Sequence, residues 1–119
     1  MRNILVVEDS PVNMELIGCL LEYEGYEVAR AMDGEQALKL IKKRDFDLIL
    51  LDIQLPGMDG LELLGIIRNM GKKRDIPVIA LTANAMAGDK ERFLDAGFTA
   101  YIAKPFDTRE FIETVVSFL

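Results

Sequence analysis

The chain has 119 residues, half of them apolar, so it can bury the core of one domain of ordinary size. Its 20 acidic residues outnumber its 14 basic residues, and the net charge of −6 makes nucleic acid and anionic membrane surfaces poor partners. The sequence contains no histidine, which excludes histidine-based general base catalysis, histidine nucleophiles and most zinc sites.

Strands and helices are predicted to alternate along the chain. In chain order we expect strand Ile4–Val7, a helix from Pro11 to Gly25, strand Tyr26–Arg30, a helix from Gly34, strand Leu48–Leu51, a helix from Gly60 to about Met70, a strand that starts at Pro77 and runs through "VIAL", a helix over about Ala85–Ala96, strand Thr99–Ile102 and a helix over Thr108–Leu119. Ser10 before Pro11 is a typical helix start, and Gly25 and Gly97 are typical helix stops.

This alternation predicts the fold class. Five strands separated by helices imply βαβ units around a parallel sheet, with helices on both faces. Right-handed crossovers leave few topologies, and a flavodoxin-like, doubly wound order 2-1-3-4-5 fits five strands. Leu48–Leu51 is apolar throughout, as a central strand should be, whereas Tyr26–Arg30 alternates like an edge strand. We expect residues 1–119 to form one domain.

Cys19 is the single cysteine, so an internal disulfide is excluded, and the cytoplasm is the location we expect. Its apolar neighbours Ile17, Leu20 and Leu21 predict a small buried side chain. No apolar stretch reaches the ~18 residues of a membrane span. Glu8 interrupts the first apolar run, so we expect no secretory signal either.

Polar residues follow several of the predicted strands at their carboxyl ends, where open α/β sheets bind their ligands. Glu8 and Asp9 follow the first strand, and Asp52 follows the third. Thr82 follows the fourth strand, and Lys104 comes two residues after the fifth. The first and third strands are neighbours in the proposed order, so we expect three carboxylates to converge at its switch point.

These residue types favour phosphoryl chemistry with a metal ion. Two like charges ~4 Å apart at an effective dielectric of ~20 repel by about 4 kcal/mol, so a cation is expected among the acids. Oxygen ligands without histidine or thiolate select a hard cation, with Mg²⁺ the first choice. A carboxylate beside Mg²⁺ can attack phosphorus to give an aspartyl phosphate. Lys104 and Thr82 could then contact the phosphoryl oxygens.

Each of these residues also has an ordinary interpretation when taken alone. The Glu8-Asp9 pair is compatible with a solvated loop, Asp52 with turn chemistry, Thr82 with a cap and Lys104 with an exposed surface. Their coincidence at one edge of one predicted sheet favours a functional site.

Four motifs carry a resemblance that covers essentially the whole chain: "ILVVEDS", "DLILLDIQLPGMDG", "PVIALTANA" and "AYIAKPF". The spacing is 30 residues from Asp52 to Thr82 and 22 from Thr82 to Lys104. No single motif is diagnostic, but the set in this order is highly specific. The sequence resembles the response-regulator receiver domains of two-component signalling, in the CheY-like superfamily.

The resemblance implies a role for each motif residue. Asp52 would accept a phosphoryl group. Mg²⁺ would be held by Glu8, Asp9, Asp52 and the backbone carbonyl of Gln54. Lys104 and Thr82 would contact the phosphate, and Thr82 and Tyr101 would switch the face formed by the fourth helix, fifth strand and fifth helix, which reads out to partners.

The resemblance also covers finer features. Gln54 and Asn84 would tune dephosphorylation, although Gln54 is equally compatible with a solvated turn and Asn84 with a helix N-cap. The Lys104–Pro105 bond is often cis in the family. Asn13 could touch the pocket, although a plain helix residue is the interpretation we favour. Glu8 departs from the commoner Asp and leaves room for a water at the metal.

The expected partners are a sensor histidine kinase or a histidine phosphotransfer protein, because the chain has no phosphohistidine of its own to offer. An output protein would bind the switched face, and a phosphorylation-dependent homodimer is left open. We expect a single-domain response regulator or the receiver of a longer one, and the start at Met1 favours a stand-alone or N-terminal receiver.

We do not expect an enzyme acting on other substrates, only self-catalysed phosphoryl transfer and hydrolysis. A Mg²⁺-dependent phosphohydrolase would usually carry a second Asp where this chain has Gln54. A degenerate scaffold receiver would be expected to lack part of the acidic cluster. Nucleotide binding is disfavoured because neither glycine-rich phosphate motif occurs.

Overall fold

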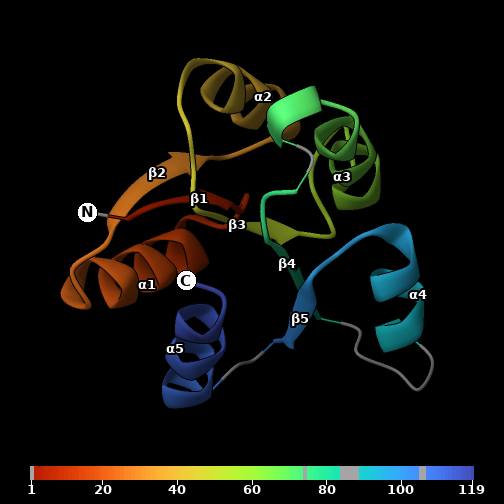
Figure 1. Cartoon of the computed structure of the whole chain (residues 1–119). Coiled ribbons are helices and arrows are strands. Elements are labelled where there is room, and N and C mark those ends of the chain that lie inside the picture. Colours follow the sequence, from red (N-terminus) through yellow and green to blue (C-terminus); the bar gives the residue numbers. More distant parts are fainter. Residues whose placement is uncertain (1, 74, 84–88, 105–106) are drawn as a thin grey trace.

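A computed structural model describes residues 2–73, 75–83, 89–104 and 107–119 of the chain. Strands and helices alternate within this part of the chain, as the sequence predicted (Figure 1). The elements are β1 (Asn3–Val7), α1 (Pro11–Tyr23), β2 (Glu27–Ala31), α2 (Gly34–Lys43), β3 (Leu48–Asp52), α3 (Gly60–Arg68), the 3₁₀ turn η1 (Gly71–Lys73), β4 (Val78–Thr82), α4 (Asp89–Ala96), β5 (Ala100–Ala103) and α5 (Thr108–Ser117).

The five strands form one parallel sheet in the order β2-β1-β3-β4-β5, which confirms the predicted fold class. The central strand β3 is buried along its whole length, and β2, at one edge, is partly exposed. Val7 pairs with Leu51 and Asp52 pairs with Leu81, so β1, β3 and β4 end at nearly the same level. Residues that follow these strands therefore meet at one edge.

Two apolar layers cover the sheet, because alternate side chains of each strand point to opposite faces. On one face, Leu5 and Val7 belong to a core with α2, α3 and α4. On the other face, Ile4 and Val6 pack with α1 and α5. Figure 1 shows α1 and α5 together below the sheet and α2 and α3 above it.

The predicted strand ends each lie within one residue of the observed ones. The helices after β3 and β5 stop two residues earlier than predicted, because each ends on capping backbone contacts at Asn69 and Phe118. The predicted start of the fourth helix, Ala85, lies outside the described residues. The turn η1 had not been predicted.

Cys19 is exposed, so the prediction that it is buried was wrong. The buried residues of α1 are Met14, Ile17, Gly18 and Leu21. At 100° per residue Cys19 lies beyond the edge of this stripe. Whether Cys19 is buried could not be predicted from its apolar neighbours in sequence, because the direction of a helical side chain follows the helix period.

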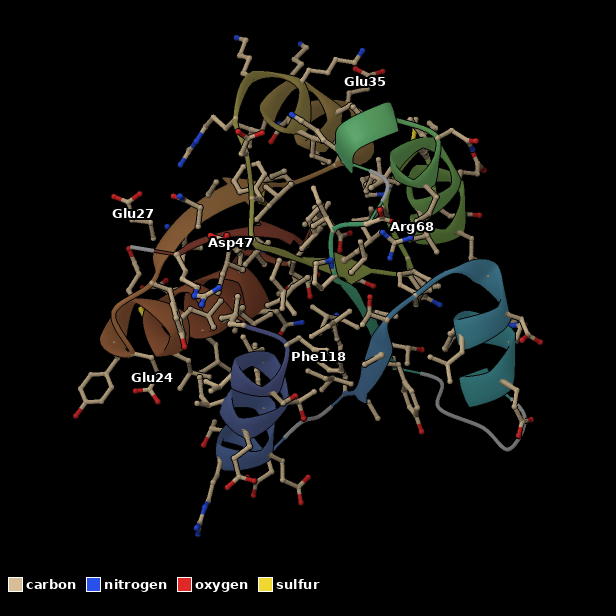
Figure 2. All side chains as sticks on the ribbon, viewed as in Figure 1. Glu24, Glu27, Glu35, Asp47, Arg68 and Phe118 are labelled. Carbon is tan, nitrogen blue, oxygen red and sulfur yellow. The ribbon has the colours of Figure 1, made fainter. Side chains whose placement is uncertain are left out.

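Arg68, at the end of α3, connects three parts of the chain. Its Nε and one terminal nitrogen donate to the Gly97 carbonyl at 3.0 and 2.8 Å, and the other donates to the Ile76 carbonyl at 2.6 Å. In Figure 2, Arg68 points inward, whereas Glu24, Glu27 and Glu35 lie on the outside. Arg68 therefore joins the end of α3 to the end of α4 and to the segment before β4.

Across the part of the chain that the structure describes, every helix is too short or too polar to cross a membrane.

Candidate functional site

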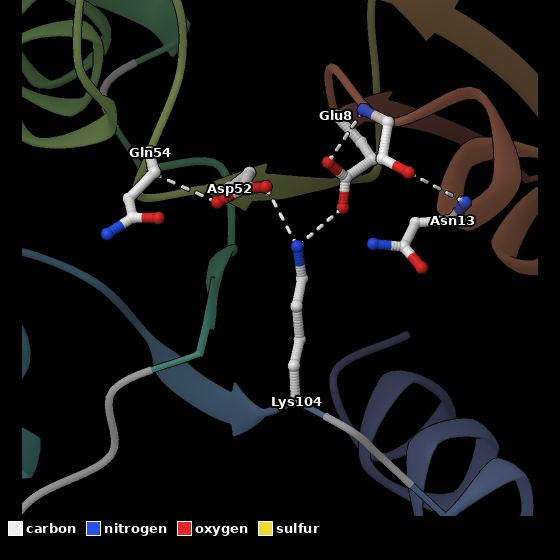
Figure 3. Close-up of polar contacts among 6 residues, drawn as sticks. Glu8, Asn13, Asp52, Gln54 and Lys104 are labelled. Atoms are coloured by element: carbon white, nitrogen blue, oxygen red, sulfur yellow. Dashed lines mark hydrogen bonds and ion pairs between the residues drawn. The ribbon is translucent and has the colours of Figure 1, made fainter.

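Side chains from four parallel strands meet at the carboxyl edge of the sheet. Glu8 follows β1, Asp52 is the last residue of β3, Thr82 is the last residue of β4 and Lys104 follows β5. Figure 3 shows Lys104 reaching up between Asp52 and Glu8. The predicted convergence of these residues is therefore present in the fold.

The three predicted acids form one cluster. One carboxylate oxygen from each of Glu8, Asp9 and Asp52 lies within 4.8 Å of the others. Glu8 is fully buried and Asp52 is only 6% exposed, whereas Asp9 faces solvent. The cluster thus has a buried side fixed by protein and an open side that water or a ligand can reach.

Lys104 bridges the two buried carboxylates. Its Nζ lies 2.6 Å from Glu8 Oε1 and 2.8 Å from Asp52 Oδ2. Burial by itself would lower the pKa of Lys104, but the hydrogen bonds to Asp52 and Glu8 outweigh burial and raise this pKa above 10.5. Lys104 is therefore a fixed positive charge at the centre of the site.

The pKa of Glu8 is raised above 4.5, and burial is the largest cause. The neighbouring Asp52 also raises this pKa, and Lys104 and the Ser10 N–H oppose the shift. A cation near Glu8 would favour its charged form. Burial makes the charged form of Glu8 unfavourable, and a positive charge beside the acids would offset this effect.

The second oxygen of each buried carboxylate accepts a backbone N–H. Asp52 Oδ1 accepts from Gln54 N at 2.9 Å, and Glu8 Oε2 accepts from Ser10 N at 3.2 Å. Ser10 in turn caps α1, with its Oγ accepting from Asn13 N at 3.3 Å. These contacts fix the orientation of both carboxylates and tie it to the start of α1 and to the turn after β3.

Gly60 lets the chain turn back directly against Asp52. Its N–H donates to the Ile53 carbonyl at 2.8 Å, which closes the loop between β3 and α3. A Cβ at this position would lie 2.5 Å from the Asp52 carbonyl oxygen and 2.8 Å from Ile53 Cα. Both atoms are backbone and cannot move aside easily, so the second glycine of "GMDG" is required by packing.

Thr82 and Tyr101 connect the site to the far edge of the sheet. Thr82 is buried, and its carbonyl accepts from Lys104 N at 2.7 Å, which joins the ends of β4 and β5. Tyr101 in β5 is half-buried, and its ring centroid lies 6.3 Å from that of Phe93 on α4. Lys104 thus touches the acids with its side chain and β4 with its backbone.

The remaining predicted residues have less defined positions. The Gln54 side chain is exposed, and in Figure 3 it points away from Lys104. The Asn13 side chain extends from α1 toward the pocket in the same view. Asn84 and Pro105 lie outside the described residues, so the tuning role and the cis bond predicted for them stay predictions.

One contact had not been predicted. The motifs indicated that Lys104 lies near Asp52, but the Glu8–Lys104 ion pair joins residues 96 positions apart. The only signal in the sequence was that Glu8 is longer than the Asp expected there.

The donor set fits a hard divalent cation. The clustered atoms are all carboxylate oxygens, and one of the three acids is open to solvent, which leaves room for water ligands. Mg²⁺ prefers such sites, with a few carboxylates and several retained waters. The chain therefore is a doubly wound α/β protein with an acidic site, suited to a divalent cation, at the switch point of its sheet.

Comparison with known proteins identifies the family. The family model described as "Response regulator receiver domain" matches residues 4–116. The chain belongs to the receiver domains of two-component response regulators.

Several relatives match almost the whole chain. The polar-differentiation response regulator DivK of Brucella anthropi is 46% identical over 118 residues, which are 99% of this chain and 96% of that protein. The response regulator TrrA of Thermotoga maritima, solved in complex with Mg²⁺ and BeF, is 40% identical with a TM-score of 0.88, and the match covers all of both chains. The receiver domain of sensor histidine kinase PA1611 from Pseudomonas aeruginosa, solved with a magnesium ion in its active site cleft, is 41% identical with a TM-score of 0.90 over 98% of this chain and 96% of that one.

Membership of this family defines the general biology. A receiver domain works with a histidine kinase or phosphotransfer protein on one side and with output partners on the other. The general function predicted from the sequence is thereby confirmed.

Proposed function

We propose that Asp52 accepts a phosphoryl group from a phosphohistidine of a partner protein. The observation that carries this proposal is the setting of Asp52, an almost buried carboxylate whose two oxygens are held by Lys104 and by the Gln54 N–H. A fixed carboxylate loses little entropy when it meets an incoming phosphorus atom. Asp52 also lies at the end of the central strand β3, which is buried along its whole length.

The transfer step is a substitution at phosphorus. An Asp52 oxygen forms the new O–P bond, the P–N bond of the donor breaks, and the imidazole nitrogen leaves with the bonding pair. Lys104 then offers its ammonium to a phosphoryl oxygen, and the Thr82 hydroxyl offers a second donor. Hydrolysis of the aspartyl phosphate by water restores Asp52, so the chain catalyses only its own phosphorylation and dephosphorylation.

Mg²⁺ is the proposed cofactor, held by Glu8, Asp9, Asp52 and the Gln54 backbone carbonyl. The support is the all-oxygen cluster with atoms within 4.8 Å and the open side at Asp9. Bound there, Mg²⁺ would offset charge on the transferring phosphoryl group. Because Lys104 contacts both Glu8 and Asp52, its ammonium would compete with the metal for these carboxylates.

The proposed switch runs from Lys104 and Thr82 to Tyr101. When a phosphoryl group draws Lys104 and Thr82, the end of β5 is pulled through the Lys104–Thr82 backbone hydrogen bond. Tyr101 lies three residues before Lys104 and is half-buried against Phe93, so it can move further inward. The α4, β5 and α5 face would then bind the output partner. The Gln54 side chain, exposed beside the site, would orient water and tune dephosphorylation.

The phosphoryl donor would dock along α1. Val12, Leu16 and Tyr23 lie on one side of this helix and are 77%, 43% and 90% exposed. An apolar stripe of this kind marks an interaction surface, and α1 begins just after Asp9. We further propose one receiver domain over residues 1–119 and a cytoplasmic location, where the exposed thiol of Cys19 would stay reduced.

The test is the intact mass of the protein after incubation with acetyl phosphate, with and without Mg²⁺. Wild type should gain one phosphoryl group only with Mg²⁺, and Asp52→Asn should gain none. Asp45→Asn is the matched control, because Asp45 is fully exposed and outside the site. An adduct that persists in Asp52→Asn would show that another residue is the acceptor. Leu16→Glu should keep the acetyl phosphate reaction and lose transfer from the kinase.

A further inference from the structure

A groove runs between the outer edge of β5 and α5. It has a volume of about 370 Å³ and is lined by Tyr101–Ala103 and by Asp107, Glu110, Phe111 and Thr114. We call these residues the β5–α5 groove. Within the described sheet, β5 pairs only with β4, so its outer edge has no neighbouring strand (Figure 1). An open strand edge can accept an extended segment through backbone hydrogen bonds.

The β5–α5 groove is acidic. Among its lining residues two are acids, Asp107 and Glu110, and none is a base. The one base in the first turn of α5, Arg109, pairs with Glu113 at 3.3 Å and does not line the groove. The groove therefore offers two carboxylates that no lining cation neutralises.

Helix capping explains where these acids lie but leaves their charge in place. Asp107 accepts from Arg109 N at 2.9 Å and from Glu110 N at 3.1 Å, as an N-cap does. Glu110 is three residues further on, the usual position of the acid in a capping box. Both side chains stay exposed, so they remain available to a partner. An Asn would cap α5 as well as Asp107 does, which allows the charge to be tested apart from the cap.

We propose that the β5–α5 groove binds a basic, extended segment of the output partner, with Lys or Arg side chains set against Asp107 and Glu110. Charge complementarity favours this occupant over a second copy of the chain, because a two-fold dimer through this groove would bring the same acids together. The apolar part of the segment would lie over Phe111 and Ile102, whose side chains are buried beneath the groove.

The position of Tyr101 links this groove to the proposed phosphorylation of Asp52. Tyr101 lines the groove and is also the residue that the proposed switch moves inward. The dependence of binding on phosphorylation rests on the proposed function, whereas the charge preference of the groove does not. An inward Tyr101 would widen the groove at the β5 end and expose more of the strand edge.

The experiment measures fluorescence anisotropy with two short labelled peptides, one in which lysine alternates with valine and one in which glutamate replaces lysine. The lysine peptide should bind wild type at least tenfold more tightly than the glutamate peptide. Asp107→Asn and Glu110→Gln together should weaken its binding at least fivefold. Glu113→Gln, an acid of the same helix outside the groove, should change binding by less than twofold. Treatment with acetyl phosphate and Mg²⁺ should tighten binding at least threefold.

Several results would overturn the proposal. Equal binding of the two peptides would do so, since it would show that charge does not select the occupant of the groove. A loss in Glu113→Gln as large as in the groove variants would also do so, since it would indicate attraction to the net charge alone. Dimerisation of the phosphorylated protein that is lost in Asp107→Asn would assign the groove to a second copy.

The mass measurement separates this proposal from the proposed function. A phosphoryl adduct on Asp52 without selective peptide binding would refute the groove alone. Selective binding without any adduct would refute the phosphoryl transfer alone, and the groove would stand.

Discussion

Replacing Lys104 by Met should make Mg²⁺ bind more tightly and make the metal-free protein less stable. Lys104 Nζ holds Glu8 at 2.6 Å and Asp52 at 2.8 Å, so it competes with a metal ion for the same oxygens. Met keeps the length and much of the packing of the lysine stem but carries no charge.

The expected gain in affinity follows from the contacts that the metal has to break. A hydrogen bond to a charged group contributes about 1.5–3 kcal/mol to stability. Since about 1.4 kcal/mol corresponds to a factor of ten, release from one such bond should tighten Mg²⁺ binding about tenfold to hundredfold. The measurement is isothermal titration calorimetry of wild type, Lys104→Met and the control Lys39→Met, an exposed lysine on α2.

The loss of stability follows from the same contacts. Removing one partner of a buried ion pair costs about 3–5 kcal/mol, because the other charge stays buried without compensation. Lys104 is mostly buried and Glu8 fully so, so Lys104→Met should lose about 3 kcal/mol in urea unfolding with EDTA. Saturating Mg²⁺ should restore most of this loss, since a ligand at a hundredfold excess over its Kd adds about 2.7 kcal/mol.

Equal Mg²⁺ affinity in wild type and Lys104→Met would refute the competition. The metal would then have to bind at oxygens that Lys104 does not occupy. A metal-free Lys104→Met as stable as Lys39→Met would mean that the bridge contributes nothing to folding, and the reasoning from burial would fail with it.

Three further predictions concern stability, each measured by urea unfolding. Because the folded state raises the pKa of Glu8 above 4.5, it holds this proton more tightly than the unfolded chain does. The stability of wild type relative to Glu8→Gln should therefore fall as pH rises from 4.5 through the raised pKa, and a flat difference would contradict the shift. Arg68→Met should lose about 1–3 kcal/mol, because the partly buried carbonyls of Gly97 and Ile76 lose their donors, and full stability in this variant would show that water replaces the guanidinium. Gly60→Ala should be destabilised by more than about 2 kcal/mol by the clash with the Asp52 carbonyl, whereas Gly65→Ala has open space and should gain about 0.5–1 kcal/mol. Equal stability of the two alanine variants would mean that the loop yields at no cost.

Most of the strands could be predicted from sequence because they are short apolar runs with polar or turn residues at both ends, and β2 could be predicted because apolar and polar residues alternate in it. Leu48–Leu51 between Asp47 and Asp52 is the clearest example. The strands β2, β4 and β5 each lie one residue further along the chain than predicted. In β2, Glu27 and Arg30 alternate with apolar residues, so no continuous apolar run marks its ends. The turn η1 is polar and only three residues long, so no periodic pattern in the sequence predicts it.

The acidic cluster was predictable for a topological reason. Once β1 and β3 are neighbours, the residues just after them must meet, whatever their side chains. By contrast, the partners of Arg68 are carbonyls of Gly97 and Ile76, in loops whose path is set by packing of the whole domain. Backbone carbonyls carry no sequence signal, so such contacts are invisible until the fold is known. The prediction that Cys19 is buried was wrong for a different reason, because it relied on residues adjacent in sequence and not on residues adjacent on the helix surface.

The bridge from Lys104 to Glu8 shows what a longer acid adds to the site. β1 and β5 are three strand spacings apart, about 14 Å at ~4.8 Å for each spacing. One side chain from each end has to cover this gap, and a lysine meeting a glutamate does so at 2.6 Å. The same ammonium holds Asp52 between them, and the Lys104 backbone holds β4. A change of charge at Asp52 thus alters a contact that spans four strands, and β5, with Tyr101 at its centre, is the strand at the end of that span.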